Sequence, residues 1–193
     1  MKKILSAVLI IVFITGSILA VNADSGPKAS VQELLGEIRQ IKSDQPDNQK
    51  HSQSALGFLN VAEISKKALG KYWSRRSETE REKFQTLLGE LFVHVAFPSS
   101  AKFFADLDLV YGKTKEKKTV VVVPLTVVHE KEGEVDIDFH LNRPGDKWQV
   151  VDVILDGVSM RNNLRSQFYK VIKKNDFNEL LRKMDKKLTS AKS

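Results

Sequence analysis

Hydrophobic residues recur with two different periods, and the change of period divides the chain into a helical first half, a β-rich middle and a helical tail. In the first half apolar positions recur every three or four residues, which is typical of amphipathic helices. This spacing predicts helices at about 28 to 43, 61 to 69, 77 to 97 and 99 to 107. The polar stretch between the first two contains Pro46 and predicts a loop at 43 to 54.

Residues that start and end helices support these assignments. Ser77 and Glu80 have the spacing of a capping box at the start of the longest amphipathic segment. Pro98 is expected to end that helix, and Gly70 to occupy the C-terminal cap of the helix before it. The boundaries of the predicted helices therefore rest on capping residues as well as on periodicity.

From Val110 the pattern becomes that of β-strands. Residues 119 to 129 are apolar at nearly every position, which indicates a strand buried on both faces, with Pro124 at an edge or a bulge. Residues 134 to 141 alternate, as in a half-buried antiparallel strand. A short strand at Val110, a polar turn after it and a strand at 148 to 155 complete the set. We predict an α+β fold with a four-stranded antiparallel sheet that helices cover on one face.

The last third of the chain is predicted to return to helix. Asp156 and Gly157 supply a turn, and Ser159 can cap a helix at about 159 to 174. A second capping box starts at Asp176 and predicts a helix at 177 to 188. The apolar stripe of the first of these helices consists of Met160, Leu164, Phe168 and Ile172.

The N-terminus has the pattern of a secretory signal. Lys2 and Lys3 precede an uncharged, mostly apolar run from 4 to 21, and Ala23 is a suitable cleavage site. We expect residues 1–23 to be a cleaved signal peptide and residues 24–193 to be one exported domain; the alternative is an uncleaved anchor. Because the chain has no Cys, its core holds without disulfides.

The chain is basic. Its net charge of +7 becomes +5 once the two lysines of the signal segment are removed. Lys and Arg are frequent near the end of the chain, at Lys170, Lys173, Lys174, Arg182, Lys183, Lys186 and Lys187. These side chains make either a solvated helix face or a surface that attracts anionic lipid or acidic protein. Nucleic acid is not an expected partner of an exported chain without interleaved aromatic and basic residues.

No arrangement of residues predicts catalysis or metal binding. The four His residues lack the spacing of zinc ligands, and the best cluster, His140 with Asp136 and Asp138, reads as a solvated strand face. Asp152 lies between apolar neighbours and is expected to make a structural hydrogen bond. We therefore expect neither an enzyme nor a cofactor, and no metal site.

Two groups of residues nevertheless resemble a known family. The first comprises Asp152, Val153, Gly157, Val158, Ser159, Asn163 and the run 165 to 168, and the second comprises 69 to 73, 79 to 81 and Phe84. Together they resemble the MlaC/toluene-tolerance family over about residues 30 to 185. The chain departs from that pattern at Val151 and Leu164, where the family often has Tyr.

The resemblance implies a periplasmic phospholipid carrier that moves lipid between the outer and inner membranes and so maintains outer-membrane lipid asymmetry. It implies a curved sheet and a helical shell around an apolar lipid cavity, with phospholipid as cargo and little head-group selectivity. The implied partners are an inner-membrane ABC transporter complex with a substrate-binding ring and an outer-membrane lipoprotein–porin complex. We expect a monomer. The residues predicted to line the cavity are Phe92, Phe104, Tyr111, Val122, Leu125, Val127, Phe139, Trp148, Val150, Leu164 and Phe168.

Two other functions remain open at this point. The first is a carrier of another lipid, such as a hopanoid or sterol, which extraction of the bound ligand would identify. The second is a non-lipid periplasmic interaction protein, for which we expect a solid core and no bound lipid.

Overall fold

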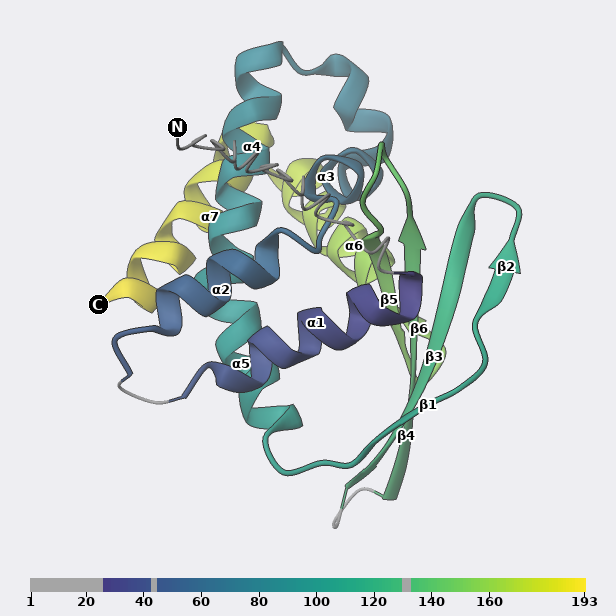
Figure 1. Ribbon diagram of the computed structural model, residues 1–193. Coiled ribbons are helices and arrows are strands. Elements are labelled where there is room, and N and C mark those ends of the chain that lie inside the picture. Colours follow the sequence, from purple (N-terminus) through teal and green to yellow (C-terminus); the bar gives the residue numbers. More distant parts are fainter. Residues whose placement is uncertain (1–25, 43–44, 130–132) are drawn as a thin grey trace, which may run out of the picture.

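The sheet forms one side of the molecule and the helices gather on the other (Figure 1). The computed structural model describes residues 26–42, 45–129 and 133–193. The predicted signal peptide, residues 1–23, lies outside the described residues. Within them the order of elements is helical, then β, then helical, as the hydrophobic pattern predicts.

The first half of the chain folds into helices that follow one another with short connections. Their bounds are α1 Pro27–Gln40, α2 Asn48–Leu56, α3 Val61–Leu69, the 3₁₀-helix η1 Gly70–Arg75, α4 Glu78–Leu91, the π-helix η2 Phe92–Ala96 and α5 Phe97–Phe104. The predicted capping box is present, because Ser77 accepts from the N–H of Glu80 while the Glu80 carboxylate accepts from that of Ser77. Gly70 caps α3 with a φ of 48°.

Two expectations for this half are wrong. The predicted loop at 43 to 54 contains most of α2, which buries only the small residues Ser52 and Ala55 against its neighbours. Pro98 does not end the helical path: η2 continues α4, and Pro98 lies in the first turn of α5.

The β-rich middle forms an open antiparallel sheet. Its strands are β1 Leu109–Tyr111, β2 Lys115–Lys117, β3 Val120–His129, β4 Gly133–Asn142, β5 Gln149–Leu155 and β6 Val158–Ser159. They are ordered β1-β3-β4-β5-β6, with β2 also paired to β3. The described residues thus contain six strands where four were predicted, because β2 and β6 are short and lack an apolar pattern.

Two irregularities shape the sheet. Opposite Pro124, residues 112 to 114 bulge between β1 and β2, and the N–H of Gly112 donates to the Pro124 carbonyl at 2.9 Å. This agrees with the bulge expected at that proline. In β5 the register against β4 shifts beside His140 and Leu141, which leaves Val151 without a partner and turns Asp152 to the face of His140.

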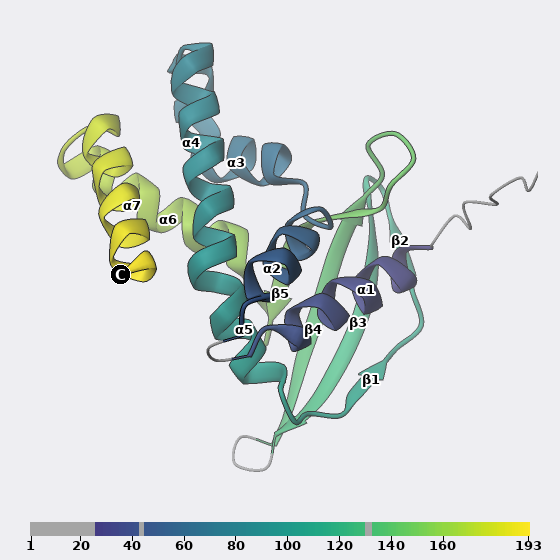
Figure 2. The same cartoon turned by 60° about the vertical axis from the view of Figure 1, so that its left-hand side comes forward.

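The tail consists of α6 Met160–Lys174 and α7 Phe177–Lys192. Ser159 and Asp176 cap them, each accepting a hydrogen bond from the backbone N–H three residues on. α6 contacts β5 and α3, and α7 contacts α4 and α6. The tail therefore returns the chain to the helical side of the sheet, as Figure 2 shows.

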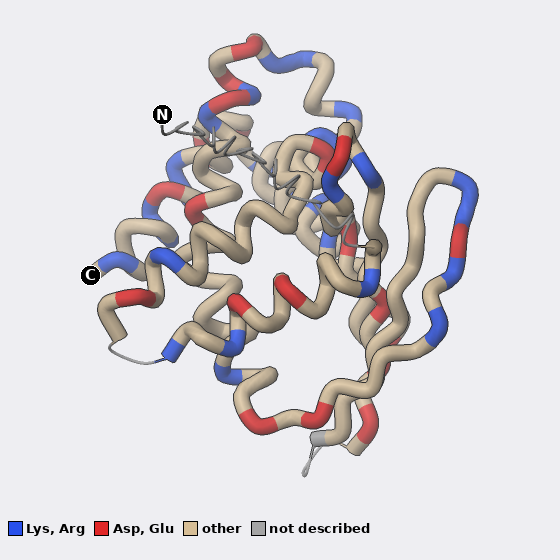
Figure 3. Tube along the Cα trace, viewed as in Figure 1, with Lys and Arg blue, Asp and Glu red and all other residues tan. Residues whose placement is uncertain are grey.

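The core lies between the sheet and this helical layer. α1 contacts β3 and β5, while α3 and α6 contact β5, so these helices face the sheet directly. Outside them α4 and α7 pack together, with Phe84 fully buried between Phe168 and Phe177. On the opposite side, lysines follow the edge formed by β2 (Figure 3), which discourages pairing with another strand.

Candidate functional site

A cavity of about 520 Å³ lies between the sheet and the helices. Its wall is formed mainly by apolar side chains from α1, η2, α5, β4, β5 and the start of α6. The lining residues are Leu34, Ile38, Leu59, Ile64, Phe92, Ala96, Phe97, Ser99, Ser100, Phe103, Phe104, Ile137, Phe139, Val150, Val151, Asp152, Val153, Leu155, Met160, Arg161, Asn163 and Leu164. Such a site suits a hydrocarbon ligand.

The helical wall of the cavity is rich in aromatic rings. Phe92 and Phe97 stack with centroids 6.2 Å apart, and Phe103 meets Phe104 edge to face at 4.9 Å. All four rings belong to the continuous segment η2–α5. The wider π-turn of η2 joins α4 to α5. π-helical turns inside α-helices are frequent at functional sites.

The sheet wall follows from strand register. Phe139 pairs with Val153, and Ile137 pairs with Leu155, so these four side chains share the face that looks toward the helices. Alternation along β4 places its apolar residues on that face and its acidic residues on the other. The sheet thus supplies a continuous apolar floor under the aromatic segment.

One corner of the wall is polar. The Asp152 carboxylate accepts from Ser159 Oγ at 2.6 Å and from the N–H of Arg161 at 3.0 Å, and the Arg161 Nη2 atom lies 3.3 Å from it. The Asp152 side chain is only 3% exposed, so these donors are what make its charge tolerable. Asp152 is therefore held in a structural role, and it fixes the first turn of α6.

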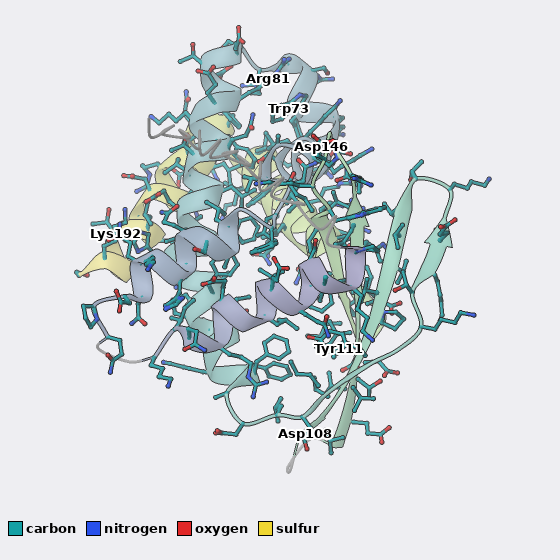
Figure 4. The ribbon with its side chains drawn as sticks, in the orientation of Figure 1. Trp73, Arg81, Asp108, Tyr111, Asp146 and Lys192 are labelled. Atoms are coloured by element: carbon teal, nitrogen blue, oxygen red, sulfur yellow. The ribbon has the colours of Figure 1, made fainter. Side chains whose placement is uncertain are left out.

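Five of the eleven predicted wall residues line the cavity: Phe92, Phe104, Phe139, Val150 and Leu164. The other six lie elsewhere. Tyr111 is at the sheet edge beside Lys28 of α1 (Figure 4), and Val122 is on the face away from Phe139.

The remaining four of those six have other neighbours. Leu125 and Val127 are buried on β3, on the same face as Ile137, but do not line the cavity, and Phe168 packs edge to face on Phe84 at 5.4 Å. Trp148 precedes β5, with Arg143 over its ring. Lipid contact stays a prediction for the five residues that line the cavity, and the structure gives the six others no place in its wall.

Sequence reasoning missed several lining residues. Ile137 could have been found, because it shares a face with Phe139 in the alternating strand. Leu34 and Ile38 belong to the apolar stripe of the first helix but gave no sign that they face a cavity rather than the core. Arg161 carried no signal at all, since only the fold brings it beside Asp152.

His140 with Asp136 and Asp138 is the best candidate for a metal cluster in the sequence. Among residues 26–42, 45–129 and 133–193 there is no group of His, Asp and Glu side chains that could hold a metal ion. Burial lowers the pKa of the His140 imidazole, the charge of Lys117 acts in the same direction, and Asp152 and Asp138 oppose them. We predicted that His140 lies on a solvated strand face. Its ring is in fact partly buried, so that prediction is only partly correct.

Comparison with known proteins bears on this cavity. A family model described as MlaC protein matches residues 28–186. The chain belongs to the MlaC family. No curated protein matches the chain. No helix within the described parts of this MlaC family member combines the length and apolar character needed to cross a membrane.

A solved structure shares the fold of this MlaC family member. It is a phospholipid-binding protein from Ralstonia solanacearum in complex with a phospholipid, with a TM-score of 0.69 and 18% identity. The match covers 86% of this chain and 99% of that one. Val151 and Leu164, the two positions that depart from the usual MlaC pattern, both line the cavity here.

Proposed function

We propose that this protein is a periplasmic carrier that binds a phospholipid by its acyl chains and moves it between the outer and inner membranes. The observation that carries the proposal is the mainly apolar cavity of about 520 Å³ in a member of the MlaC family. The similar Ralstonia solanacearum protein, which was solved with a phospholipid, supports the same ligand class. Such transport would serve outer-membrane lipid asymmetry.

Such a cavity keeps the acyl chains of the lipid out of water, which would otherwise cost a large free energy. At about 0.8 kcal/mol per methylene, a sixteen-carbon chain left in water costs about 12 kcal/mol. The bilayer already shelters the chain equally well, so the carrier need only match it. The direction of transport must then come from its partners, which we propose are an ATP-driven transporter complex with a substrate-binding ring and an outer-membrane lipoprotein–porin complex.

The volume of the cavity favours a second candidate ligand. A cavity of about 150 Å³ holds one benzene ring, so 520 Å³ corresponds to about twenty carbon atoms. That is one long acyl chain, whereas a phospholipid has two. A single-chain lipid, such as a lysophospholipid or fatty acid, fits the cavity as it stands, and a two-chain lipid requires a larger cavity.

Native mass spectrometry of the exported protein tests both candidates. We expect bound lipid, and its mass distinguishes one chain from two. Leu164→Glu should abolish binding, because a carboxylate in an apolar wall is costly. Ile172→Glu is the matched control, since Ile172 lies on the same helix, is also half-buried, and does not line the cavity.

Circular dichroism must show both variants folded. Undiminished lipid in Leu164→Glu would show that this cavity is not the binding site. A wild-type protein that carries no lipid, and takes none from vesicles, would refute the carrier function.

A further inference from the structure

Two segments of the chain that contain no acidic residue lie side by side in the fold. Residues 64–77 include five Lys and Arg and no Asp or Glu, and residues 162–175 include four Lys and Arg and no Asp or Glu. The first segment forms the end of α3 and all of η1, and the second forms most of α6. α3 and α6 contact each other directly, so the fold brings the two basic segments together.

Specific contacts fix the junction between these segments. The Arg165 Nε–H donates to the Lys67 carbonyl at 2.8 Å, and the Lys71 N–H donates to the Tyr169 hydroxyl at 3.0 Å. The Lys71 ammonium lies 5.5 Å from the centroid of the Tyr72 ring and 5.7 Å from that of the Tyr169 ring. Aromatic rings from both segments therefore stabilise this charge.

The cations at this junction have no acidic partners. We define the basic face as Lys71, Arg165, Lys170, Lys173 and Lys174, of which all but Arg165 are exposed. Within residues 26–42, 45–129 and 133–193, none of the five forms an ion pair with a carboxylate. α7 differs, because Glu179 pairs there with Arg182 at 2.6 Å and with Lys183 at 4.0 Å, as on an ordinary solvated helix face. A concentration of charge without counter-charges is expected of a surface that meets an anionic partner.

The basic face begins close to the opening of the cavity. Asn163 lines the cavity and is also exposed, so the cavity reaches the surface near the start of α6. From there an exposed stripe with a spacing of three or four residues runs along α6 through Gln167 and Lys170 to Lys174. Lys170 lies about 10 Å along the helix axis from Asn163. A partner that binds the basic face therefore also lies close to the cavity opening.

We propose that the basic face docks the protein on the phosphate groups of an anionic phospholipid bilayer. This inference rests on the proposed function and adds that the carrier touches a bilayer itself. Phosphate groups are spread over a whole bilayer, so lysines on flexible stems meet them without the fixed geometry that a protein partner requires. The half-exposed rings of Tyr72 and Tyr169 suit the same partner, because amphipathic aromatic side chains favour the boundary between lipid and water. A bilayer therefore fits this face better than an acidic protein.

Cosedimentation with vesicles tests the proposal. The exported protein is mixed with vesicles of phosphatidylcholine alone, or of equal parts phosphatidylcholine and phosphatidylglycerol. We expect wild type to bind the phosphatidylglycerol vesicles more tightly, and to lose that preference at high salt. Each lysine near an anionic bilayer strengthens binding by about 5-fold. The triple variant Lys170→Gln, Lys173→Gln and Lys174→Gln should therefore bind these vesicles about 100-fold more weakly.

A matched control removes three exposed lysines elsewhere. Lys113→Gln, Lys115→Gln and Lys118→Gln lower the net charge by the same amount at the β2 edge, which Figure 2 places far from the end of α6. We expect this control to bind phosphatidylglycerol vesicles within about 5-fold of wild type, the effect of a single lysine. Circular dichroism must show both variants folded. Native mass spectrometry should show the same bound lipid in both, because neither changes a residue that lines the cavity.

The outcomes separate this proposal from the carrier function. Equal binding of the α6 variant and the control to phosphatidylglycerol vesicles refutes the basic face as the docking surface. A wild type that does not bind these vesicles also refutes it, and retention on immobilised poly-glutamate would then assign the face to an acidic protein. In both cases bound lipid in native mass spectrometry leaves the carrier function standing. A wild type that carries no lipid and takes none from the vesicles refutes the carrier function, and this inference with it.

Discussion

Replacing Gly70 with alanine should destabilise the fold through one specific contact. Gly70 has φ 48° and ψ −119°, a conformation that is open to glycine and strained for other residues. A Cβ built there would overlap the hydroxyl of Tyr169. That hydroxyl accepts from the Lys71 N–H at 3.0 Å, and the Tyr169 ring meets Tyr72 edge to face at 4.8 Å.

The expected loss can be estimated from these contacts. Backbone strain costs about 1–3 kcal/mol. Displacing Tyr169 removes a hydrogen bond worth about 0.5–1.5 kcal/mol and disturbs an aromatic pair of similar value. We expect Gly70→Ala to lower the free energy of unfolding by about 2–6 kcal/mol, a large share of the roughly 5–15 kcal/mol typical of proteins.

A double-mutant cycle separates strain from overlap. Without the hydroxyl, the nearest atom to the added Cβ is the ring carbon Cζ at 3.5 Å, an ordinary contact. Gly70→Ala should therefore cost only about 1–3 kcal/mol in the Tyr169→Phe background. Urea unfolding followed by fluorescence and circular dichroism measures all four proteins. Effects that add to within about 0.5 kcal/mol would refute the contact as the reason for glycine here.

Two further predictions concern the polar corner and its neighbour. Asp152→Asn should lower the free energy of unfolding by about 2–4 kcal/mol in thermal melts, because Arg161 loses its counter-charge. The folded variant should still bind lipid. Complete loss of lipid from the folded variant would contradict a purely structural role. His140 has a folded pKa below its unfolded value of about 6.5, so its neutral form favours folding above that pH, and stability falls as the pH drops through the folded pKa. In urea unfolding at pH 7.5 and 5, His140→Gln should lose less stability on acidification than wild type; an equal loss would contradict the effect of burial on His140.

The sequence predicted the elements that carry their own local signal. The capping box at Ser77, the alternation around Phe139 and the cap at Ser159 each depend on residues close together in the chain, and each is present. α2 was missed because its sequence is polar and only packing against α1 and η2 makes it a helix. β2 was missed for the same reason, since its residues pair with β3 without an apolar pattern.

The cavity was harder to predict than the fold. Val122 belongs to a strand that is apolar at nearly every position, so periodicity could not say that it faces away from the helices. Leu125 does lie on the inward face, paired with Ile137, but outside the cavity lining. Phe168 has the right character, but its helix turns it toward Phe84. Arg161 reaches Asp152 only because the Asp156–Gly157 turn reverses the chain beside β5. None of these side-chain orientations can be predicted from residue type alone.

The π-helix η2 makes the shape of the cavity tolerant of a change of length at one place, the junction between α4 and α5. Each residue of an α-helix turns the chain by about 100°, and a π-turn accommodates one residue more than an α-turn. Deleting one residue between Phe92 and Ala96 would therefore let the segment close as an α-turn and keep Phe97, Phe103 and Phe104 on the side of the sheet. Large apolar residues can replace one another in this wall with modest effect. A deletion of one residue within the regular helix α4 has no such surplus to remove, so it would rotate α5 by about 100° relative to α4 and turn the aromatic wall away.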